Sequence, residues 1–327
     1  MSVYNAERYL VDAVQSVLSQ SFRDFEFIII NDGSTDQSRN ILSRFDDSRV
    51  QIVDNSQNKG LIYSLNLGFS LARGKYIARM DADDVCLPHR LQIQFQFMES
   101  NQGLGLCGSD YINFSESFSK NCSTLKGADI LKSWLLFSSP LCHPSVMIRR
   151  SAFPIEGYDI NFPHVEDYEL WTRIALNHTL DNCDSFLLKY RDHPNQVSKE
   201  KRNQQIQSSS LIQKNYLKRL GFLFSEEELL IHSLASSGEK INNLSGLIKI
   251  SEWLNNLLIQ NEKIKALDVY SLQYCVGRIF YDVCGNTSLG RIAFKFWRRS
   301  PLRRYYGSDL KSSFRQRIKC AVRKFRS

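Results

Sequence analysis

The sequence predicts an α/β domain over residues 1–200, with a mostly parallel central sheet flanked by helices, followed by a smaller helical region over residues 201–327. Up to about residue 75, continuously apolar runs typical of strands buried on both faces alternate with amphipathic helical stripes. Polar turns follow these runs, and beyond about residue 200 the chain is rich in Gln, Lys and Leu and lacks strand signals. Ligands of such sheets bind at the carboxyl ends of the strands.

The first half of the domain alternates strands and helices. Asn5 is a candidate cap for a helix whose apolar residues recur with the spacing of one buried face: Leu10, Ala13, Val14, Val17 and Leu18. We expect strands at "FEFIII", "VQIVDN" and "KYIARM", and the turn "NDGSTDQS" begins a further helix. The helix "LIYSLNLGFSLARG" is expected to end at Gly74.

The segment "MSVYN" resembles the last residues of a strand that leads into the first helix. The first strand of a doubly wound sheet lies centrally, where missing residues would leave backbone groups unpaired. We therefore expect a strand of about five residues upstream of Met1, either because the start is misassigned or because the gene is truncated. An intact mass measured on the native protein tests this expectation.

In the second half we expect a helix that begins at Pro88 and a short strand at "LGLCGSD". Residues 111–126 are polar and are expected to form a loop. A strand at "HPSVMIRR", a helix at "EDYELWTRIALN" and a strand at "SFLLKYR" then complete the domain, and its boundary falls between about residues 198 and 210.

The composition is that of an ordinary globular protein, with 43% hydrophobic and 23% charged residues. The eight cysteines are scattered and form no CxxC pair, so neither a zinc site nor a disulfide scaffold is indicated. No apolar run approaches the roughly 20 residues that span a bilayer, and the N-terminus lacks a basic and apolar signal peptide. We expect a reduced, cytoplasmic setting.

Three carboxylates follow the strand "KYIARM" within four residues: Asp81, Asp83 and Asp84. Oxygen ligands suit hard divalent cations, and Mg²⁺ or Mn²⁺ held by one or two carboxylates completes its shell with water and substrate phosphates. A solvated acidic loop is the alternative interpretation of such a short motif.

Three further residues favour a binding site. Asp32 closes the strand "FEFIII" at the same sheet edge and could bind a nucleobase or ribose, or cap the helix after Gly33. Asp167 opens the helix "EDYELWTRIA", where it could cap the helix or act as a general base. His193 lies in a polar turn directly after a strand, which suits a metal ligand or a phosphate contact.

Together these motifs resemble the inverting family 2 glycosyltransferases with a GT-A fold. The resemblance covers residues 1 to about 200 and is carried by "VYNAERYLVDAVQSVLSQSFRDFEFIIINDGSTDQS", "NKGLIYSLNLGFSLARGKYIARMDADD", "HPSVMIRRSAF", "VEDYELWTRIA" and "YRDHPNQVS". The departure is the first strand, which in the family ends just before the position of Tyr4.

The resemblance implies a role for each matching residue. Tyr4 would pack on the nucleobase and Asp32 would bind it, while Asp81 would hold the ribose and sugar. Asp83 would bind Mg²⁺ or Mn²⁺, and His193 would contact the metal or the diphosphate. Asp167 would be the catalytic base, whereas Asp84 and His143 have no definite assignment; His143 would shape the acceptor pocket or simply begin a strand.

The resemblance further implies transfer of a sugar from a nucleotide sugar to a glycan or lipid-linked acceptor in cell-surface polysaccharide synthesis. The rival classes are a phosphotransferase with a DxD aspartate as nucleophile and a catalytically inactive nucleotide-sugar-binding protein. A phosphotransferase would place the DxD after its first strand, whereas here it follows several βα units. Intact DxD and ED pairs disfavour the inactive protein.

The C-terminal segment is basic. From Arg291 to the end, 13 Lys or Arg residues face a single acid, Asp309, so the remainder of this +8 chain carries a net charge of about −4. Aromatic residues interleave with these cations, which suits peripheral association with an anionic membrane on its cytoplasmic face. A solvated basic face is the alternative, and nucleic acid is not the expected partner.

Overall fold

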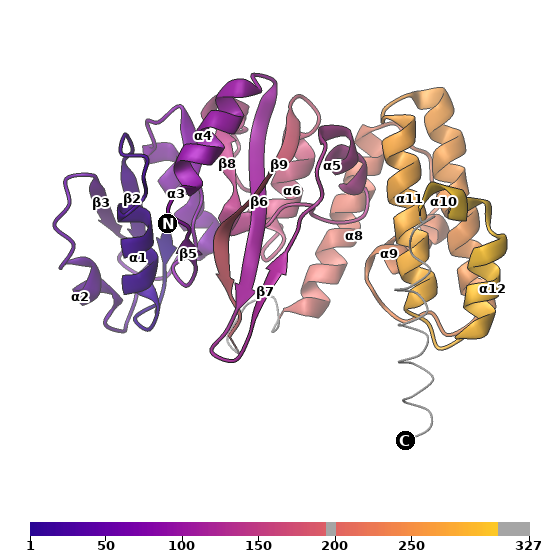
Figure 1. Ribbon diagram of the computed structural model, residues 1–327, viewed down its shortest axis with the longest axis horizontal. Helices are drawn as coiled ribbons and strands as arrows, with labels where there is room; N and C mark the ends of the chain where they lie inside the picture. The colour runs from indigo at the N-terminus through magenta and orange to yellow at the C-terminus, as the bar shows by residue number, and fades with distance from the viewer. Residues whose placement is uncertain (194–200, 307–327) are drawn as a thin grey trace. The chain divides into compact units, whose positions relative to one another are not determined.

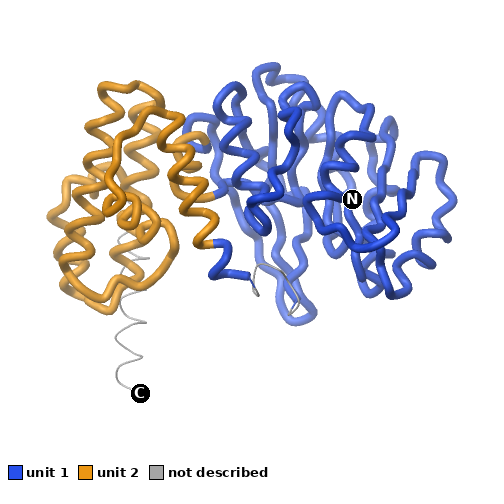
Figure 2. The backbone as a smooth tube through the Cα atoms, turned by 180° about the vertical axis from the view of Figure 1, so that it is seen from behind, with its two compact units in different colours: residues 1–131, 139–205 blue, residues 132–138, 206–327 orange. Residues whose placement is uncertain are grey.

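The computed structural model describes residues 1–193 and 201–306. The predicted basic tail beyond residue 306 therefore lies outside the described residues. The chain divides into two compact units, the first comprising residues 1–131 and 139–205 and the second residues 132–138 and 206–327 (Figure 2).

The first unit begins with a three-stranded parallel sheet, ordered β1 (Ser2–Val3), β2 (Phe27–Asn31) and β3 (Val50–Asp54). All five residues of β2 are buried, as its apolar run predicted. The helices that alternate with these strands are α1 (Leu10–Leu18), α2 (Ser38–Leu42) and α3 (Leu61–Leu71) (Figure 1). The predicted alternation of strands and helices is confirmed here.

A second, six-stranded sheet follows in the same unit. Its order is β4 (Tyr76–Ala78), β8 (Met147–Arg149), β6 (Leu104–Phe114), β9 (Thr179–Arg191) and β5 (Val85–Cys86), with β7 (Ser119–Cys122) paired to β6. Only β6 and β9 run parallel; the other pairs in this sheet are antiparallel. The domain is α/β as predicted, but its sheet is mixed, and the mostly parallel arrangement holds only for β1 to β3.

Several predicted element boundaries were wrong. The polar segment 111–126 is not simply a loop, because β6 extends to Phe114 and pairs with β7 in an antiparallel hairpin. Backbone pairing fixes such a hairpin, so its side chains need no apolar alternation. "HPSVMIRR" begins as the 3-10 helix η1 (His143–Ser145) before β8, and the helix expected at Pro88 is α4 (Arg90–Ser100).

Two predicted helix ends are also corrected. Asn5 does not cap α1; it has a left-handed backbone, with φ of 50°, and its Oδ1 accepts a hydrogen bond from the Thr35 backbone N–H at 2.8 Å. Gly74 does not close α3, which ends at Leu71; instead the Gly74 N–H donates to Glu26 Oε1 at 3.2 Å. Asn5 and Gly74 both bind residues that are distant in the sequence, and a local sequence pattern cannot predict such contacts.

The remaining elements of the first unit are short. The 3-10 helix η2 (Arg150–Ala152) follows β8, and α6 (Glu166–Ile174) precedes β9. The helix α5 (Ala128–Trp134) begins in the first unit and ends in the second.

The second unit is helical, as predicted for the C-terminal region. It contains most of α8 (Arg202–Arg219), then α9 (Glu226–Ser236), α10 (Leu244–Ile264), α11 (Val269–Gly285), α12 (Arg291–Arg299) and the 3-10 helix η3 (Pro301–Tyr305). Within residues 1–193 and 201–306, no helix combines the length and apolar character required to cross a membrane.

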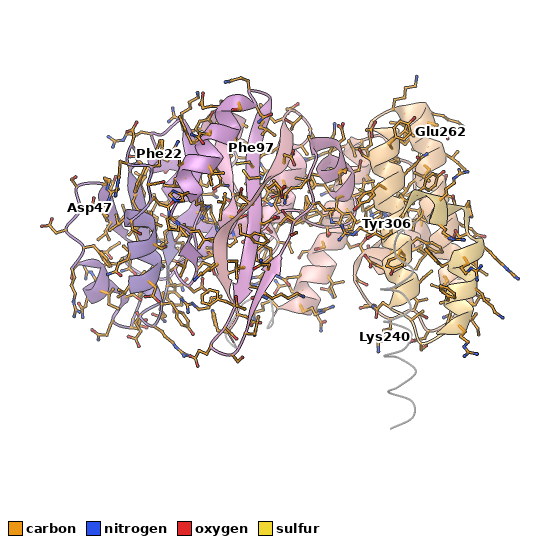
Figure 3. All side chains as sticks on the ribbon, viewed as in Figure 1. Phe22, Asp47, Phe97, Lys240, Glu262 and Tyr306 are labelled. Carbon is orange, nitrogen blue, oxygen red and sulfur yellow. The ribbon has the colours of Figure 1, made fainter. Side chains whose placement is uncertain are left out.

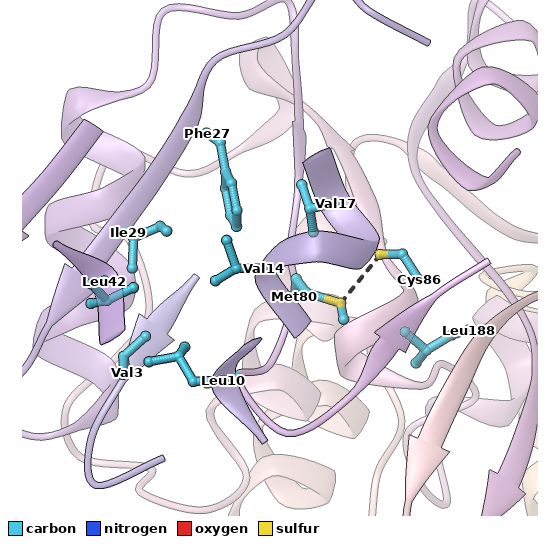
Figure 4. Close-up of a cluster of buried hydrophobic side chains, with 11 residues drawn as sticks. Val3, Leu10, Val14, Val17, Phe27, Ile29, Leu42, Met80, Cys86 and Leu188 are labelled. Atoms are coloured by element: carbon cyan, nitrogen blue, oxygen red, sulfur yellow. Dashed lines mark hydrogen bonds between the residues drawn. The ribbon is translucent and has the colours of Figure 1, made fainter. Parts of the chain in front are cut away.

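A hydrophobic cluster supports the loop that carries the three clustered aspartates (Figure 4). Met80 and Ala82, which alternate with Asp81 and Asp83, are buried against side chains of α1, β1 and β2.

A second hydrophobic cluster packs α4 on the six-stranded sheet, and the partly buried Phe22 and Phe97 pack against this cluster (Figure 3). Residues of β2 and β4 also line a cavity of about 890 Å³.

Candidate active site

The three clustered aspartates lie between β4 and β5, and one ligand oxygen from each falls within 4.8 Å of the others. The intervening Met80 and Ala82 are buried, so the core fixes the backbone that presents Asp81 and Asp83. Asp81 also forms an isolated parallel bridge with Ser2 of β1, which ties this loop to the first sheet. The predicted grouping of carboxylates at a sheet edge is therefore present.

Burial and mutual repulsion make this cluster costly in its ionised form. Burial raises the pKa of Asp81, although the Arg79 guanidinium beside it acts in the opposite direction. Burial raises the pKa of Asp84 well above its usual range, and the charges of Asp81 and Asp83 add to this effect. A bound cation would relieve both contributions.

The donor set fits a hard divalent cation. All three groups are carboxylates, which suit Mg²⁺ or Mn²⁺, and Asp84 Oδ2 is buried without a hydrogen-bond partner among the described residues. His193 reaches the same group from the end of β9, where its Nε2 lies 2.9 Å from Asp83 Oδ2. Asp81, Asp83, Asp84 and His193 could thus hold a metal ion.

Asp84, whose role the sequence left open, is the most buried of the three aspartates, with 1% exposure. Its Oδ1 accepts a hydrogen bond from the Arg191 backbone N–H at 2.8 Å. The side chain therefore anchors the aspartate loop to the end of β9.

Tyr4 and Asp32 follow two paired strands. Val3 of β1 lies opposite Asn31 of β2, so Tyr4 and Asp32 leave the sheet at the same edge. Tyr4 is 48% exposed, whereas Asp32 is 2% exposed. An exposed ring at this edge is available to a ligand.

The Asp32 carboxylate has several internal partners. Asn55 Nδ2 and the Lys59 N–H donate to its Oδ1 at 2.7 and 3.0 Å, and the Gly60 N–H donates to its Oδ2 at 2.9 Å. It thereby holds the turn before α3, not the helix after Gly33. These donors occupy three of the about four acceptor positions of a carboxylate.

Glu166 and Asp167 form the first turn of α6, where the helix N-terminus favours negative charge. Glu166 is buried, and burial together with the charge of Asp167 raises its pKa to about 7. Asp167 is only half-buried; burial raises its pKa, while the Tyr168 backbone N–H and then Arg79 act in the opposite direction. Of the two carboxylates, Asp167 is the one accessible to a substrate.

Arg79, which the sequence analysis missed, connects the two acidic groups. Its side chain is 5% exposed, and its guanidinium pairs with Asp81 and exerts its charge on both Glu166 and Asp167. Its buried Nε has no hydrogen-bond partner within the described part of the chain. The sequence held one indication of this role: Arg79 lies near the end of the expected strand "KYIARM", two residues before Asp81.

His143 begins η1, and its Nε2 lies 2.9 Å from the hydroxyl oxygen of Tyr158. Its ring also meets Trp171 of α6 edge-on, with centroids 5.7 Å apart. Asn66 fixes the backbone of Tyr158 through two hydrogen bonds of 2.8 and 2.9 Å. His143 is therefore part of a polar and aromatic group beside Asp167, whose charge acts on Tyr158.

Comparison with known proteins agrees with this geometry. The family model described as glycosyl transferase family 2 matches residues 1–154. An uncharacterised glycosyltransferase of Haemophilus influenzae is 33% identical over 240 residues, which cover 67% of this chain and 73% of the relative. The UDP-Glc:alpha-D-GlcNAc-diphosphoundecaprenol beta-1,3-glucosyltransferase WfgD of Escherichia coli is 28% identical over 204 residues, with coverage of 62% and 79%.

Among solved structures, the mannosyltransferase PcManGT of Pyrobaculum calidifontis, in complex with GDP-Man and Mn²⁺, superimposes with a TM-score of 0.54. The match covers 99% of this chain and 84% of that chain at 13% identity. At this identity the likeness establishes the fold alone, and it confirms the predicted fold class.

Proposed function

The chain belongs to glycosyl transferase family 2, with a GT-A fold, and from this premise we propose that it is a metal-dependent inverting glycosyltransferase. Its donor is a nucleotide diphosphate sugar, and its acceptor is a hydroxyl group of a glycan or lipid-linked saccharide in cell-surface polysaccharide synthesis. The named donor and lipid-linked acceptor of the E. coli relative, and the GDP-Man of the P. calidifontis structure, support these classes.

The observation that carries the proposal is the convergence of Asp81, Asp83 and Asp84 within 4.8 Å, with His193 on Asp83. A divalent cation supplies positive charge to the diphosphate as the leaving group gains negative charge. Asp83 and His193 are the residues that would hold it, since their side chains already meet. The Mn²⁺ in the P. calidifontis structure supports a cation of this kind.

The nucleotide would lie along the edge formed by Tyr4, Asp32 and Asp81. The half-exposed ring of Tyr4 offers a face for stacking, and the remaining acceptor position of Asp32 offers a partner for an N–H of the base. Asp81 would bind a ribose or sugar hydroxyl, with its orientation fixed by Arg79.

Asp167 acts as the general base. It removes the proton of the acceptor hydroxyl while the acceptor oxygen bonds to the anomeric carbon and the bond to the diphosphate oxygen breaks. Attack on the face opposite the leaving group inverts the anomeric centre. Burial raises the pKa of the Asp167 carboxyl, which makes its carboxylate a stronger base, while the Tyr168 backbone N–H and the Arg79 charge act in the opposite direction.

Membrane association is the further part of the proposal. Six cations of α12 and η3 are exposed: Arg291, Lys295, Arg298, Arg299, Arg303 and Arg304. A surface of this kind suits the inner, anionic face of a cell membrane, where a lipid-linked acceptor is presented.

The test is transfer measured with a panel of nucleotide sugars and Mn²⁺. Asp83→Ala should lose metal-dependent turnover, and Asp167→Asn should lose about 10² to 10⁴-fold in kcat with donor binding retained. Full turnover by both variants would show that the assigned mechanism is wrong. Donor binding without transfer or hydrolysis by the unmodified chain would favour an inactive binding protein, and an aspartyl phosphate would favour a phosphotransferase.

A further inference from the structure

Arg191, at the end of β9, contacts two of the three clustered aspartates at once. Its backbone N–H donates to Asp84 Oδ1 at 2.8 Å, and its Nε donates to the Asp83 backbone carbonyl at 2.7 Å. One residue therefore holds both the main chain and a side chain of the aspartate loop, which lie 108 and 107 positions away in the sequence.

Aromatic rings fix the Arg191 guanidinium itself. Its central carbon lies 4.4 Å from the ring centroid of Tyr9 and 4.7 Å from that of Phe114. Asp12 Oδ2 lies 3.6 Å from its terminal nitrogen, and the side chain is 16% exposed. The start of α1, the end of β6 and the end of β9 thus all contribute to the position of one cation.

The same Tyr9 ring also packs on His193, with centroids 5.4 Å apart. His193 in turn lies 2.9 Å from Asp83 Oδ2, which closes a ring of contacts: Arg191, Asp83, His193 and Tyr9. Ionised carboxylates repel one another, and these contacts oppose that repulsion in a group whose ligand oxygens lie within 4.8 Å of one another.

We propose that Arg191 is a positioning residue that preorganises the divalent-cation site by holding the Asp83 backbone and Asp84, with Tyr9 fixing both Arg191 and His193. The inference rests on the metal dependence in the proposed function. Residues that orient metal ligands without touching the ion commonly change metal affinity by about 10 to 100-fold when they are replaced.

Binding of Mn²⁺ alone, followed by electron paramagnetic resonance without a donor, tests this separately from transfer. Arg191→Lys keeps the charge but loses the Nε donor and the planar face, so Mn²⁺ should bind about 10-fold more weakly. Tyr9→Leu should also weaken binding, whereas Tyr9→Phe, which keeps the ring, should bind within about twofold of the unmodified chain.

Arg149 provides a matched control. It too lies over an aromatic ring, 5.1 Å from the centroid of Tyr76, and its Nε donates to the Leu104 carbonyl at 2.9 Å, but it touches no clustered aspartate. Its two terminal nitrogens also donate to the Tyr76 hydroxyl and the Met98 carbonyl, at 3.0 and 3.1 Å, so Arg149→Lys should reduce thermal stability at least as much as Arg191→Lys. It should nevertheless leave Mn²⁺ affinity unchanged.

The outcomes separate the two levels of the proposal. Equal Mn²⁺ affinity in Arg191→Lys, Tyr9→Leu and the unmodified chain would overturn the inference and leave the proposed function intact. An equal loss in Arg149→Lys would overturn it as well, because the effect would then be general destabilisation. If the unmodified chain binds no Mn²⁺ at all, the metal dependence in the proposed function is wrong. The proposed role of Arg191 is then wrong as well, because it depends on that metal site.

Discussion

At the scale of single residues, the site is a problem of charge balance. Asp81, Asp84, Glu166 and Asp167 share the field of one buried guanidinium, Arg79, and their carboxyl pKa values are nevertheless raised because burial outweighs its attraction. Arg79 cannot lose its proton, so it is a permanent counter-charge to both acidic groups. Glu166 has the clearest consequence, since it is buried and its Oε2 lacks a hydrogen-bond partner among the described residues.

Replacement of Glu166 should therefore stabilise the fold at alkaline pH. Its pKa rises from an ordinary value of 4.5 to about 7, so the folded state binds this proton more tightly. The resulting stability is complete below pH 4.5 and is lost as the pH rises through about 7. Glu166→Gln cannot ionise and keeps that stability, which should amount to roughly 3 kcal/mol at pH 8 and little at pH 4.5.

Urea unfolding of both proteins at pH 4.5 and pH 8, without metal ions, measures this difference. Glu169→Gln is the control on the same helix, because Glu169 pairs with Arg173 at 2.7 Å and its loss should destabilise at both pH values. The same gain for Glu166→Gln at both pH values would contradict the assigned pKa.

At the scale of elements, the turn after β2 shapes the sheet edge at which we propose that the nucleotide binds. Gly33 has φ of 65°, and a Cβ there would lie 2.4 Å from the Gln57 carbonyl carbon and 2.6 Å from the Asn58 nitrogen. Both obstacles are backbone atoms of the loop that donates two N–H groups to Asp32. The turn therefore needs glycine for its conformation and for this close approach.

Gly33→Ala should unfold the chain more easily and weaken donor binding. The left-handed backbone alone costs about 1 to 2 kcal/mol, and displacement of the 57–60 loop adds to it. Gly238→Ala isolates the first contribution, because Gly238 has φ of 70° and no atom within 4 Å of its Cβ position. Thermal unfolding of both variants measures the loss of stability, and nucleotide titration measures the loss of donor binding. Equal losses of stability in the two variants would mean that crowding at Gly33 is unimportant.

Some helices and strands were predictable from the sequence, and others were not. The apolar run of β2 and the stripe of α1 were predicted because burial imposes a local pattern on them. The β6 and β7 hairpin was missed because its polar side chains carry no such period. Arg79 and Arg191 were missed for a related reason: their roles depend on partners that the fold brings near, such as Asp83 at 108 positions from Arg191. Asp83 and His193, by contrast, were found through their positions after strands, and the structure brings them together.

At the scale of the whole molecule, charge is divided along the chain. The net charge of +8 arises from the segment that begins at Arg291, since the residues before it are weakly acidic. The described part of this segment presents its six cations to solvent, while Trp297 and Leu302 are buried beneath them. The guanidinium carbons of Arg303 and Arg304 lie 5.4 and 4.7 Å from the ring centroids of Trp297 and Tyr305.

This surface should bind anionic membranes. Each cation near anionic lipid contributes about 1 kcal/mol, so Arg298→Gln, Arg299→Gln, Arg303→Gln and Arg304→Gln together should reduce partitioning on the order of 100-fold or more. Liposome flotation with anionic and neutral lipid, at low and high salt, measures it, because screening should weaken the attraction as salt rises.

Four exposed lysines of the same unit, Lys218, Lys240, Lys263 and Lys265, allow a control with the same change in net charge. Their replacement by Gln should leave flotation nearly unchanged if the α12 and η3 surface is the binding face. Equal recovery of the unmodified chain from anionic and neutral vesicles would contradict electrostatic binding. An equal loss in both quadruple variants would instead assign the attraction to net charge, since the cations would then act without a defined surface.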